Sequence, residues 1–474
     1  MAASIAIVGA GFSGTALALG LRAQAPSDVT IQLVDRSGRF GPGLAYHPTS
    51  AAHLLNVPAG RMSAFPDQPD DFLDWLRAQP GSAETAPGTF APRAAYGAYL
   101  AERLRAGIAA RDGARLQIRG DQATAIARSG DGYALTLATG GALTADLVVL
   151  ALGNEPPMPP PELGLLMGTP VWGGDAWSPA ALQGLDPDAP VLLVGTSLTM
   201  VDVVISLLDA GHRGPIHAIS RRGLLPRAHR TPPAPAMTLP TPLPPRVGAV
   251  MRVLRAEVAA GHPWHAVVDA LRPHTQGLWG AMDPAEQARF LRHARAWWDV
   301  HRHRMAPEVA ARIDAAQSSG QLRVQAGRIV AASPAGRAAT ITWRRRGETA
   351  SERLTIARVI ACTGPGSDVR RCANPLLLDL LRRGLGRPDP LAIGLDVTET
   401  LELRGGSGDV SQGVFAIGPL TKGRSWEITS VPDIRVQAAT LAAHLAARAA
   451  QVGASAVGPV AAGVAPAGTW RAVG

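Results

Sequence analysis

The sequence predicts an α/β protein in which one strand–helix–strand unit is used twice within 474 residues. Two apolar strands, residues 5–9 and 191–195, each run directly into a turn and a helix with apolar periodicity. Each unit later ends in a second apolar run that closes on glycine, at residues 147–153 and 357–364. The chain is also longer than one hydrophobic core usually organises. This layout is typical of two tandem Rossmann-like, dinucleotide-binding domains.

The elements expected in the two units follow the same order. The helices and second strands after the two turns are expected at residues 14–23 and 30–34, and at residues 200–210 and 216–219. Alternating residues at 134–137 and 340–343 predict a small β-meander before each closing strand. We therefore expect both domains to carry β-meander insertions.

Proline-rich segments indicate where the domains divide. Residues 156–161 favour an extended linker, and residues 231–245 lead into helical spacing that contains four tryptophans. We expect a first domain begun by residues 1–160, a second domain over 161–355 with a helical insertion at about 245–316, and the rest of the first domain at 356–450. Residues 451–474 lack periodicity and are expected to form a disordered tail.

Composition excludes several classes of function. The net charge is +9, but Lys422 is the only lysine and the arginines are scattered, so a nucleic-acid groove is not expected. The two cysteines, Cys362 and Cys372, form no CxxC pair, which excludes dithiol chemistry and suits the cytoplasm. No apolar run approaches the roughly 20 residues of a membrane span, and no secretion signal is expected at the start.

The first turn, Gly9-Ala10-Gly11-Phe12-Ser13-Gly14, has the spacing of a dinucleotide fingerprint between a strand and a helix. Gly9 permits the tight turn, Gly11 lets a pyrophosphate approach the backbone, and Gly14 lets helix and strand pack closely. The helix N-terminus then faces the phosphate charge. Asp35 ends the second strand, where a carboxylate accepts hydrogen bonds from a ribose.

The second turn, Gly195-Thr196-Ser197, is a weaker match because Ser197 stands where the fingerprint has a glycine. The strand that follows ends in Ser220-Arg221-Arg222, and a guanidinium there can pair with a 2′-phosphate. The second domain is therefore expected to bind NADPH rather than NADH.

No metal site is expected. His301 and His303 lie at i and i+2, so on a helix they point in different directions and cannot share one ion. His47, His53 and His229 have no partner in the sequence, and no nucleophilic triad is predicted.

Several longer segments resemble the FAD/NAD(P)-binding family that includes bacterial FAD-dependent urate hydroxylases and amino-acid N-monooxygenases. The resemblance covers residues 1 to about 445 and rests on residues 43–46, 53–59, 62–66 and 418–423, with 195–202, 220–223 and 298–304. It implies a flavin monooxygenase in which NADPH reduces FAD and a flavin hydroperoxide transfers one atom of O₂ to a small substrate. It also implies that Asn56–Pro58 and Met62 lie near the isoalloxazine and that residues 426–434 close its other side.

No catalytic side chain is predicted. The residues expected to bind the two cofactors are Gly9, Gly11, Ser13, Gly14, Asp35, Arg36, Tyr46, Asn56, Val57, Met62, Gly153, Gly195, Thr196, Ser197, Ser220, Arg221, Arg222, Gly364, Gly418, Trp426 and Ile434.

The sequence departs from the family pattern at Ser197 and at Gly418-Pro419, where many flavoproteins have Gly-Asp. Residues 156–180 also lack a histidine, which argues against the Baeyer–Villiger subclass. The preferred substrate is urate or a related heterocycle. The alternatives are N-hydroxylation of an amino acid or amine, with Glu427 as the carboxylate for an ammonium group, and a flavin-binding redox sensor without turnover. The sequence leaves open whether the chain forms a homo-oligomer.

Overall fold

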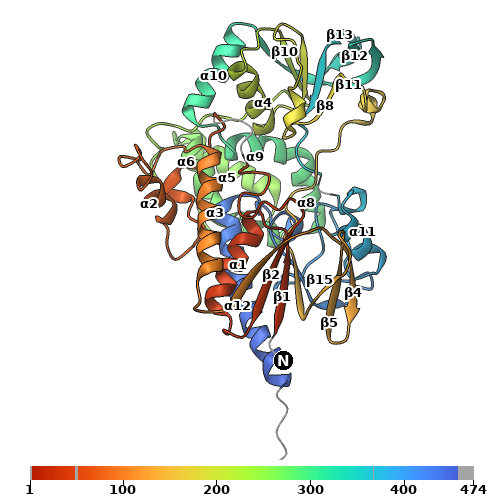
Figure 1. The fold of residues 1–474 in the computed structure, drawn as a ribbon. Helices are drawn as coiled ribbons and strands as arrows, with labels where there is room; N and C mark the ends of the chain where they lie inside the picture. The colour runs from red at the N-terminus through yellow and green to blue at the C-terminus, as the bar shows by residue number, and fades with distance from the viewer. Residues whose placement is uncertain (1–2, 48–51, 367, 457–474) are drawn as a thin grey trace, which may run out of the picture.

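The computed structural model describes residues 3–47, 52–366 and 368–456. Figure 1 shows two lobes, each built on a β-sheet, with helices α5, α6, α8 and α9 lying between them. The lower lobe carries the start and the end of the described chain, and the upper lobe carries its middle. The mixed α/β class and the parallel sheets expected from the sequence are confirmed.

The lower lobe is organised around a six-stranded sheet in the order β15-β16-β7-β1-β2-β3. Its strands are β1 (Ser4–Val8), β2 (Thr30–Asp35), β3 (Arg115–Gly120), β7 (Leu147–Leu150), β15 (Glu402–Arg404) and β16 (Val410–Ala416). β1 pairs in parallel with both β2 and β7, so the expected first unit forms the middle of this sheet. The predicted β-meander is a separate three-stranded sheet of β4 (Ala123–Ser129), β5 (Gly132–Leu137) and β6 (Ala142–Ala145).

Three long helices lie along one side of the sheet in the lower lobe (Figure 1). They are α1 (Phe12–Gln24), α3 (Arg93–Ala109) and α12 (Val431–Ala456), and the smaller helices of this lobe are α2 (Asp71–Arg77) and α11 (Pro375–Arg382). α1 packs along α12, which brings the end of the described chain back against its beginning. α12 continues to Ala456, past the expected end of the domain near residue 450, and the rest of the expected tail lies outside the described residues.

The upper lobe contains a seven-stranded sheet in the order β13-β12-β11-β10-β9-β14-β8. Its strands are β8 (Trp172–Asp175), β9 (Val191–Val194), β10 (Ile216–Ser220), β11 (Leu322–Ala335), β12 (Ala338–Arg345), β13 (Glu352–Ile356) and β14 (Arg358–Ala361), and its helices are α4 (Leu198–Asp209) and α10 (Pro307–Ser318). Here the meander is not separate, because β11 continues from the parallel part of the sheet into its antiparallel pair with β12. β14 pairs with β9, so a division after residue 355 cuts this sheet, whereas a division near Gly364 keeps it whole.

The helices between the lobes come from the predicted helical stretch. They are α5 (Val247–Ala259), α6 (Trp264–Leu271), α7 (Thr275–Ala281), α8 (Pro284–Arg289), a π-helical turn (Phe290–Ala294) and α9 (Arg295–Arg302). Their apolar faces form a small cluster of their own, apart from the two large sheet cores. These helices also contact the lower lobe, where Trp279 packs on Trp426. Within the described residues, none of the helices combines the length and the hydropathy of a membrane span.

Candidate functional site

The turn between β1 and α1 has the close packing that its glycines predict. Gly9 has a φ of +108°, and a side chain on it would collide with the carbonyl group of Ala151 at the end of β7. A side chain on Gly14 would collide with the carbonyl oxygen of Gly9. Helix α1 and strand β1 therefore meet at a distance that only glycine permits.

The same turn leaves room for a diphosphate on its outer side. Helix α1 begins after Gly11, and no side chain caps its N-terminus. A Cβ built on Gly11 would have Gly43 Cα as its nearest neighbour at 3.6 Å, and one built on Gly153 would meet nothing within 4 Å. An uncapped helix N-terminus beside open backbone is a site for phosphate oxygens, so the residues present fit the pyrophosphate of FAD.

Asp35 lies at the end of β2 and is held by its own turn. Its Oδ2 accepts a hydrogen bond from the Ala10 N–H at 2.8 Å, and its Oδ1 accepts from the Ser37 N–H at 2.8 Å and the Ser37 hydroxyl at 2.6 Å. Oδ2, which accepts only one of these bonds, keeps acceptor capacity for a ribose hydroxyl. Arg36 is exposed beside Glu155, whose pKa is raised because burial outweighs the opposing charge of Arg36. Glu155 directly precedes the proline-rich linker and belongs to no motif in the sequence.

The last part of the chain closes over the start of α1. Gly418 has a φ of +71°, and a Cβ on it would lie 2.5 Å from Ser13 Oγ. The Gly418 N–H donates to Gln437 Oε1 at 2.8 Å, and Gln437 Nε2 donates to Thr421 Oγ1 at 3.0 Å. The structure thus brings together Ser13 and Gly418, which are far apart in the sequence. Gln437 carries no sequence signal, because its role depends only on this folding back.

The residues expected around the isoalloxazine are mostly packed. Met62 and Ile434 are buried in the lower core, and Val57 packs partly against it. Tyr46 lies against Tyr96 with ring centroids 4.6 Å apart, and burial raises the pKa of Tyr46 to about 12. The carbonyl of Asn56 accepts a hydrogen bond from His229 Nε2 at 3.0 Å, which links this segment to the upper lobe.

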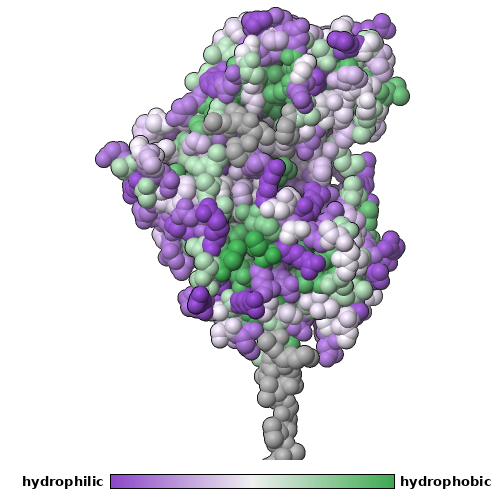
Figure 2. Space-filling model, viewed as in Figure 1, coloured by the Kyte–Doolittle hydropathy of each residue, from purple (hydrophilic) through white to green (hydrophobic). Residues whose placement is uncertain are grey.

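An exposed apolar surface lies beside this region. Leu44, in the loop after β2, is 58 % exposed, next to the Gly43 that faces Gly11. Figure 2 shows hydrophobic residues gathered in a patch over the region where Figure 1 draws α1, with hydrophilic residues around it. An apolar surface next to the diphosphate turn suits a flat ring system attached to that diphosphate.

The second turn repeats the geometry of the first. A side chain on Gly195, with a φ of +120°, would collide with the carbonyl of Cys362, just as one on Gly9 would collide with that of Ala151. Ser197 is the N-cap residue of α4, yet its hydroxyl makes no capping hydrogen bond, so this helix N-terminus is also open. Gly364 has a φ of +81° with no neighbour within 4 Å, which matches Gly153.

Of the side chains expected to select NADPH, three make hydrogen bonds within the protein and one, Arg221, is exposed. Thr196 Oγ1 hydrogen-bonds Ser220 Oγ at 2.9 Å and the carbonyl of Leu224 at 2.6 Å, so these two predicted residues stabilise the loop itself. Arg222 Nη2 donates to the carbonyl oxygen of Arg292 at 3.1 Å. Arg221 is exposed, which makes it the better placed of the two arginines for a phosphate from solvent.

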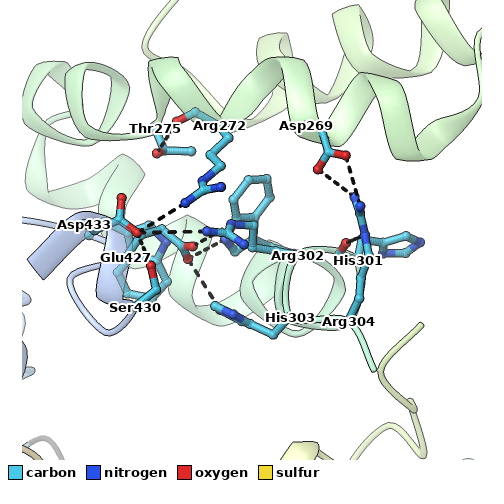
Figure 3. Close-up of polar contacts among 12 residues, drawn as sticks. Asp269, Arg272, Thr275, His301, Arg302, His303, Arg304, Glu427, Ser430 and Asp433 are labelled. Atoms are coloured by element: carbon cyan, nitrogen blue, oxygen red, sulfur yellow. Dashed lines mark hydrogen bonds and ion pairs between the residues drawn. The ribbon is translucent and has the colours of Figure 1, made fainter. Parts of the chain in front are cut away.

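A buried ion-pair cluster joins the helices between the lobes to the segment before α12 (Figure 3). Glu427 accepts a hydrogen bond from Trp298 Nε1 at 2.7 Å and forms ion pairs with Arg302 at 3.1 Å and His303 at 3.7 Å. Burial works against the charge of Glu427, but these partners prevail and lower its pKa to about 2. Glu427 thus already has a cationic partner in Arg302, which weakens its expected role as a carboxylate for a substrate ammonium group. Its φ of +69° is a further sign that the fold fixes its position.

His301 and His303 point to different places, as their spacing predicts. His301 packs against Trp264 with ring centroids 4.8 Å apart, whereas His303 faces Glu427. Among residues 3–47, 52–366 and 368–456, no group of three or more His, Cys, Asp or Glu could hold a metal ion.

Trp426 lies at the meeting point of the cluster and the helices. It is 4 % exposed, and its ring centroid is 4.9 Å from that of Trp279 and 4.9 Å from Lys422 Nζ. Burial lowers the pKa of Lys422 to about 8. Trp426 also forms part of the wall of a cavity of about 650 Å³.

A second polar contact joins the two lobes. His53 Nε2 lies 2.8 Å from Ser206 Oγ and 3.0 Å from the carbonyl of Asp202, both on α4. The Asp202 carboxylate pairs instead with Arg93 of α3 at 2.9 Å.

Comparison with known proteins agrees with this geometry. Residues 6–155 match a family of FAD-NAD(P)-binding domains. Over 88 % of this chain, uncharacterized proteins of Mycobacterium tuberculosis and Mycobacterium bovis are 26 % identical, and the match covers 89 % of their length. Residues 6–155 are therefore an FAD-NAD(P)-binding domain.

Similar solved structures cover nearly the whole chain. Ornithine hydroxylase from Pseudomonas aeruginosa has a TM-score of 0.65 and 17 % identity, over 94 % of this chain and 99 % of that one. L-lysine 6-monooxygenase from Pseudomonas syringae has a TM-score of 0.64 and 17 % identity, over 95 % and 100 %. The FAD-bound cadaverine monooxygenase from Erwinia amylovora has a TM-score of 0.62 and 12 % identity, over 98 % and 99 %. The chain shares the fold of these monooxygenases.

Proposed function

We propose that this chain, with its FAD-NAD(P)-binding domain at residues 6–155, is an FAD-dependent, NADPH-consuming monooxygenase that hydroxylates the nitrogen of an amine. The observation that carries the proposal is the pair of matching turns. In each turn, a glycine packs against the end of the closing strand of the same sheet. In each, the helix N-terminus that follows is not capped by a side chain. Two such turns suit two dinucleotides, as electron transfer from NADPH to FAD requires.

When bound, FAD would carry the chemistry with O₂. The protein would position the substrate and exclude water. In the balanced reaction, an amine, O₂, NADPH and a proton are converted to a hydroxylamine, water and NADP⁺. The chain's own residues would hold the diphosphate at Gly11 and the ribose at Asp35, while Arg221 would bind the 2′-phosphate of NADPH.

The comparisons favour an amine over urate. The three solved structures described above act on ornithine, lysine and cadaverine by their names, and none of them is a urate hydroxylase. Urate, the substrate preferred from the sequence, is therefore replaced as first choice and is kept as a comparison substrate.

The test is to purify the protein, record its flavin spectrum and follow NADPH-dependent O₂ uptake with ornithine, lysine, cadaverine and urate. Formation of hydroxylamine with an amine supports the proposal. Uptake stimulated by urate alone would return the choice to a heterocycle. A flavin-loaded protein that consumes no NADPH with any substrate would favour the redox-sensor alternative.

A further inference from the structure

The helices between the two lobes line an open cavity of about 650 Å³ that belongs to neither dinucleotide turn. One face of each of α5, α6, α7 and α9, with the π-helical turn, lines it. The lining residues are Val247, Val250, Met251, Leu254, Arg255, Val258, Trp264, Val267, Val268, Leu271, Thr275, Leu278, Trp279, Met282, Phe290, His293, Ala294, Trp297, Trp298, His301 and Trp426. A volume of roughly 300–1,000 Å³ is the usual size of a small-molecule site.

The chemistry of the wall restricts what can bind. Five tryptophans and a phenylalanine face the space, so flat rings find surfaces on which to stack. The polar members of the wall are Arg255, Thr275, His293 and His301, and no carboxylate is among the lining residues. A substrate ammonium group would find no counter-charge there and would have to give up its hydration.

The acidic groups Glu427 and Asp269, which lie behind the wall, are already paired. Glu427, behind Trp298, pairs with Arg302 at 3.1 Å. Asp269, on α6, accepts two hydrogen bonds from Arg304 at 3.0 Å each. Both carboxylates therefore stabilise the wall of the cavity rather than face a ligand.

One side of the cavity is open. Val258 and Trp297, both in the wall, are each 45 % exposed. Contiguous exposed apolar surface beside a hollow is typical of a ligand-binding groove. The wall also includes Trp298, which donates a hydrogen bond to Glu427, and Trp426, which lies in the segment expected to face the flavin.

We propose that this cavity binds an uncharged aromatic amine, and that such an amine is the substrate class. The inference rests on the proposed function, because it names the substrate of that same monooxygenase. The nitrogen of an aromatic amine is neutral near pH 7, so it needs no carboxylate partner and its electron pair is free to form the N–O bond. One oxygen atom of O₂ enters the new N–OH group, the other leaves as water, and NADPH supplies the two electrons.

Binding is tested by isothermal titration calorimetry of the flavin-loaded protein with 4-butylaniline, and with cadaverine as the charged probe. Val268→Trp fills the cavity from α6, and Val258→Arg places a charge at its open side. Ala259→Arg is the matched control, because it adds the same charge at an exposed neighbour outside the wall. We expect 4-butylaniline to bind, both wall variants to weaken it about ten-fold or more, and the control to change it less than about two-fold. If Val268→Trp fails to fold, Val258→Arg against Ala259→Arg decides the matter alone.

Four results would overturn the inference. Absence of 4-butylaniline binding, or binding that both wall variants leave unchanged, would show that the cavity is not the site. A dimer that dissociates in Val258→Arg but not in Ala259→Arg would show that a second copy covers it. Binding without stimulated O₂ uptake, in a protein that does hydroxylate cadaverine, would reject aromatic amines as substrates and leave the monooxygenase proposal standing. If no flavin-loaded protein can be prepared because the chain takes up no FAD, the same titration is made on the apoprotein, and binding of 4-butylaniline there would keep the cavity as a site and reject the proposed function.

Discussion

Replacing Glu427 by glutamine tests the buried cluster that joins the helices between the lobes to the segment before α12. The side chain keeps its shape and can still accept the hydrogen bond from Trp298 Nε1, but Arg302 loses its counter-charge. Folding lowers the pKa of Glu427 from 4.5 to about 2, a difference that corresponds to about 3 kcal/mol of stability at neutral pH. Removing one partner of a buried ion pair costs about 3–5 kcal/mol, which is the same order.

The pH dependence has a definite sign. Because the pKa of Glu427 is depressed in the folded state, its contribution is complete above pH 4.5 and is lost as the pH falls from there towards about 2. Asp433, Asp299 and Lys422 lie in the same cluster and remain in the variant, so the difference between the two proteins isolates Glu427.

The assay is urea unfolding of both proteins at pH 7 and at several lower pH values. Glu427→Gln should lose about 3 kcal/mol at pH 7, and the difference between the two proteins should shrink below pH 4.5 and vanish only as the pH approaches 2. Glu399→Gln is the control, because Glu399 pairs with Arg424 at the surface and should contribute less than about 1 kcal/mol. A Glu427→Gln protein as stable as wild type at pH 7 would refute the reasoning.

Three further predictions concern the turns and the backbone. Gly11→Val should fold but lose more than about 90 % of its bound FAD, because the branched side chain enters the space for the diphosphate. Gly88→Val is the control, because Gly88 lies in open surroundings and this variant should keep the flavin absorbance. A Gly11→Val protein with full flavin absorbance would contradict the site. Arg221→Ala should raise the KM for NADPH about ten-fold with little effect on the KM for NADH, measured in steady-state assays. Arg337→Ala, at another exposed arginine, is the control. An unchanged ratio of the KM for NADPH to the KM for NADH would exclude Arg221 as the phosphate ligand. Ala392→Gly should raise the free energy of unfolding by about 0.5–1 kcal/mol, because Ala392 has a φ of +54°; a loss of stability would show that this conformation is not strained.

Local signals predicted the fold well where apolar strands and glycine turns coincide. The helix expected at residues 14–23 is α1, Phe12–Gln24, and the one expected at 200–210 is α4, Leu198–Asp209. Both depend on residues next to each other in the chain. The position of β14 within the second sheet and the length of α12 depend on tertiary packing, which no local pattern reports.

The candidate site was predicted unevenly for the same reason. The glycines of the first turn follow from backbone geometry, so the sequence identifies them. Gln437 anchors Gly418 from another element, and Glu427 finds its cations on α9. Contacts between distant segments cannot be derived from one sequence. The cavity likewise follows from how four helices are spaced, although their tryptophans were visible beforehand.

The most direct test of the account is to incubate the purified protein with FAD, remove free flavin, and add NADPH without oxygen. We predict one FAD per chain, a visible absorbance that NADPH bleaches, and its return when oxygen is admitted. A protein that stays colourless after reconstitution would contradict the assignment of the first turn, and with it the proposed chemistry.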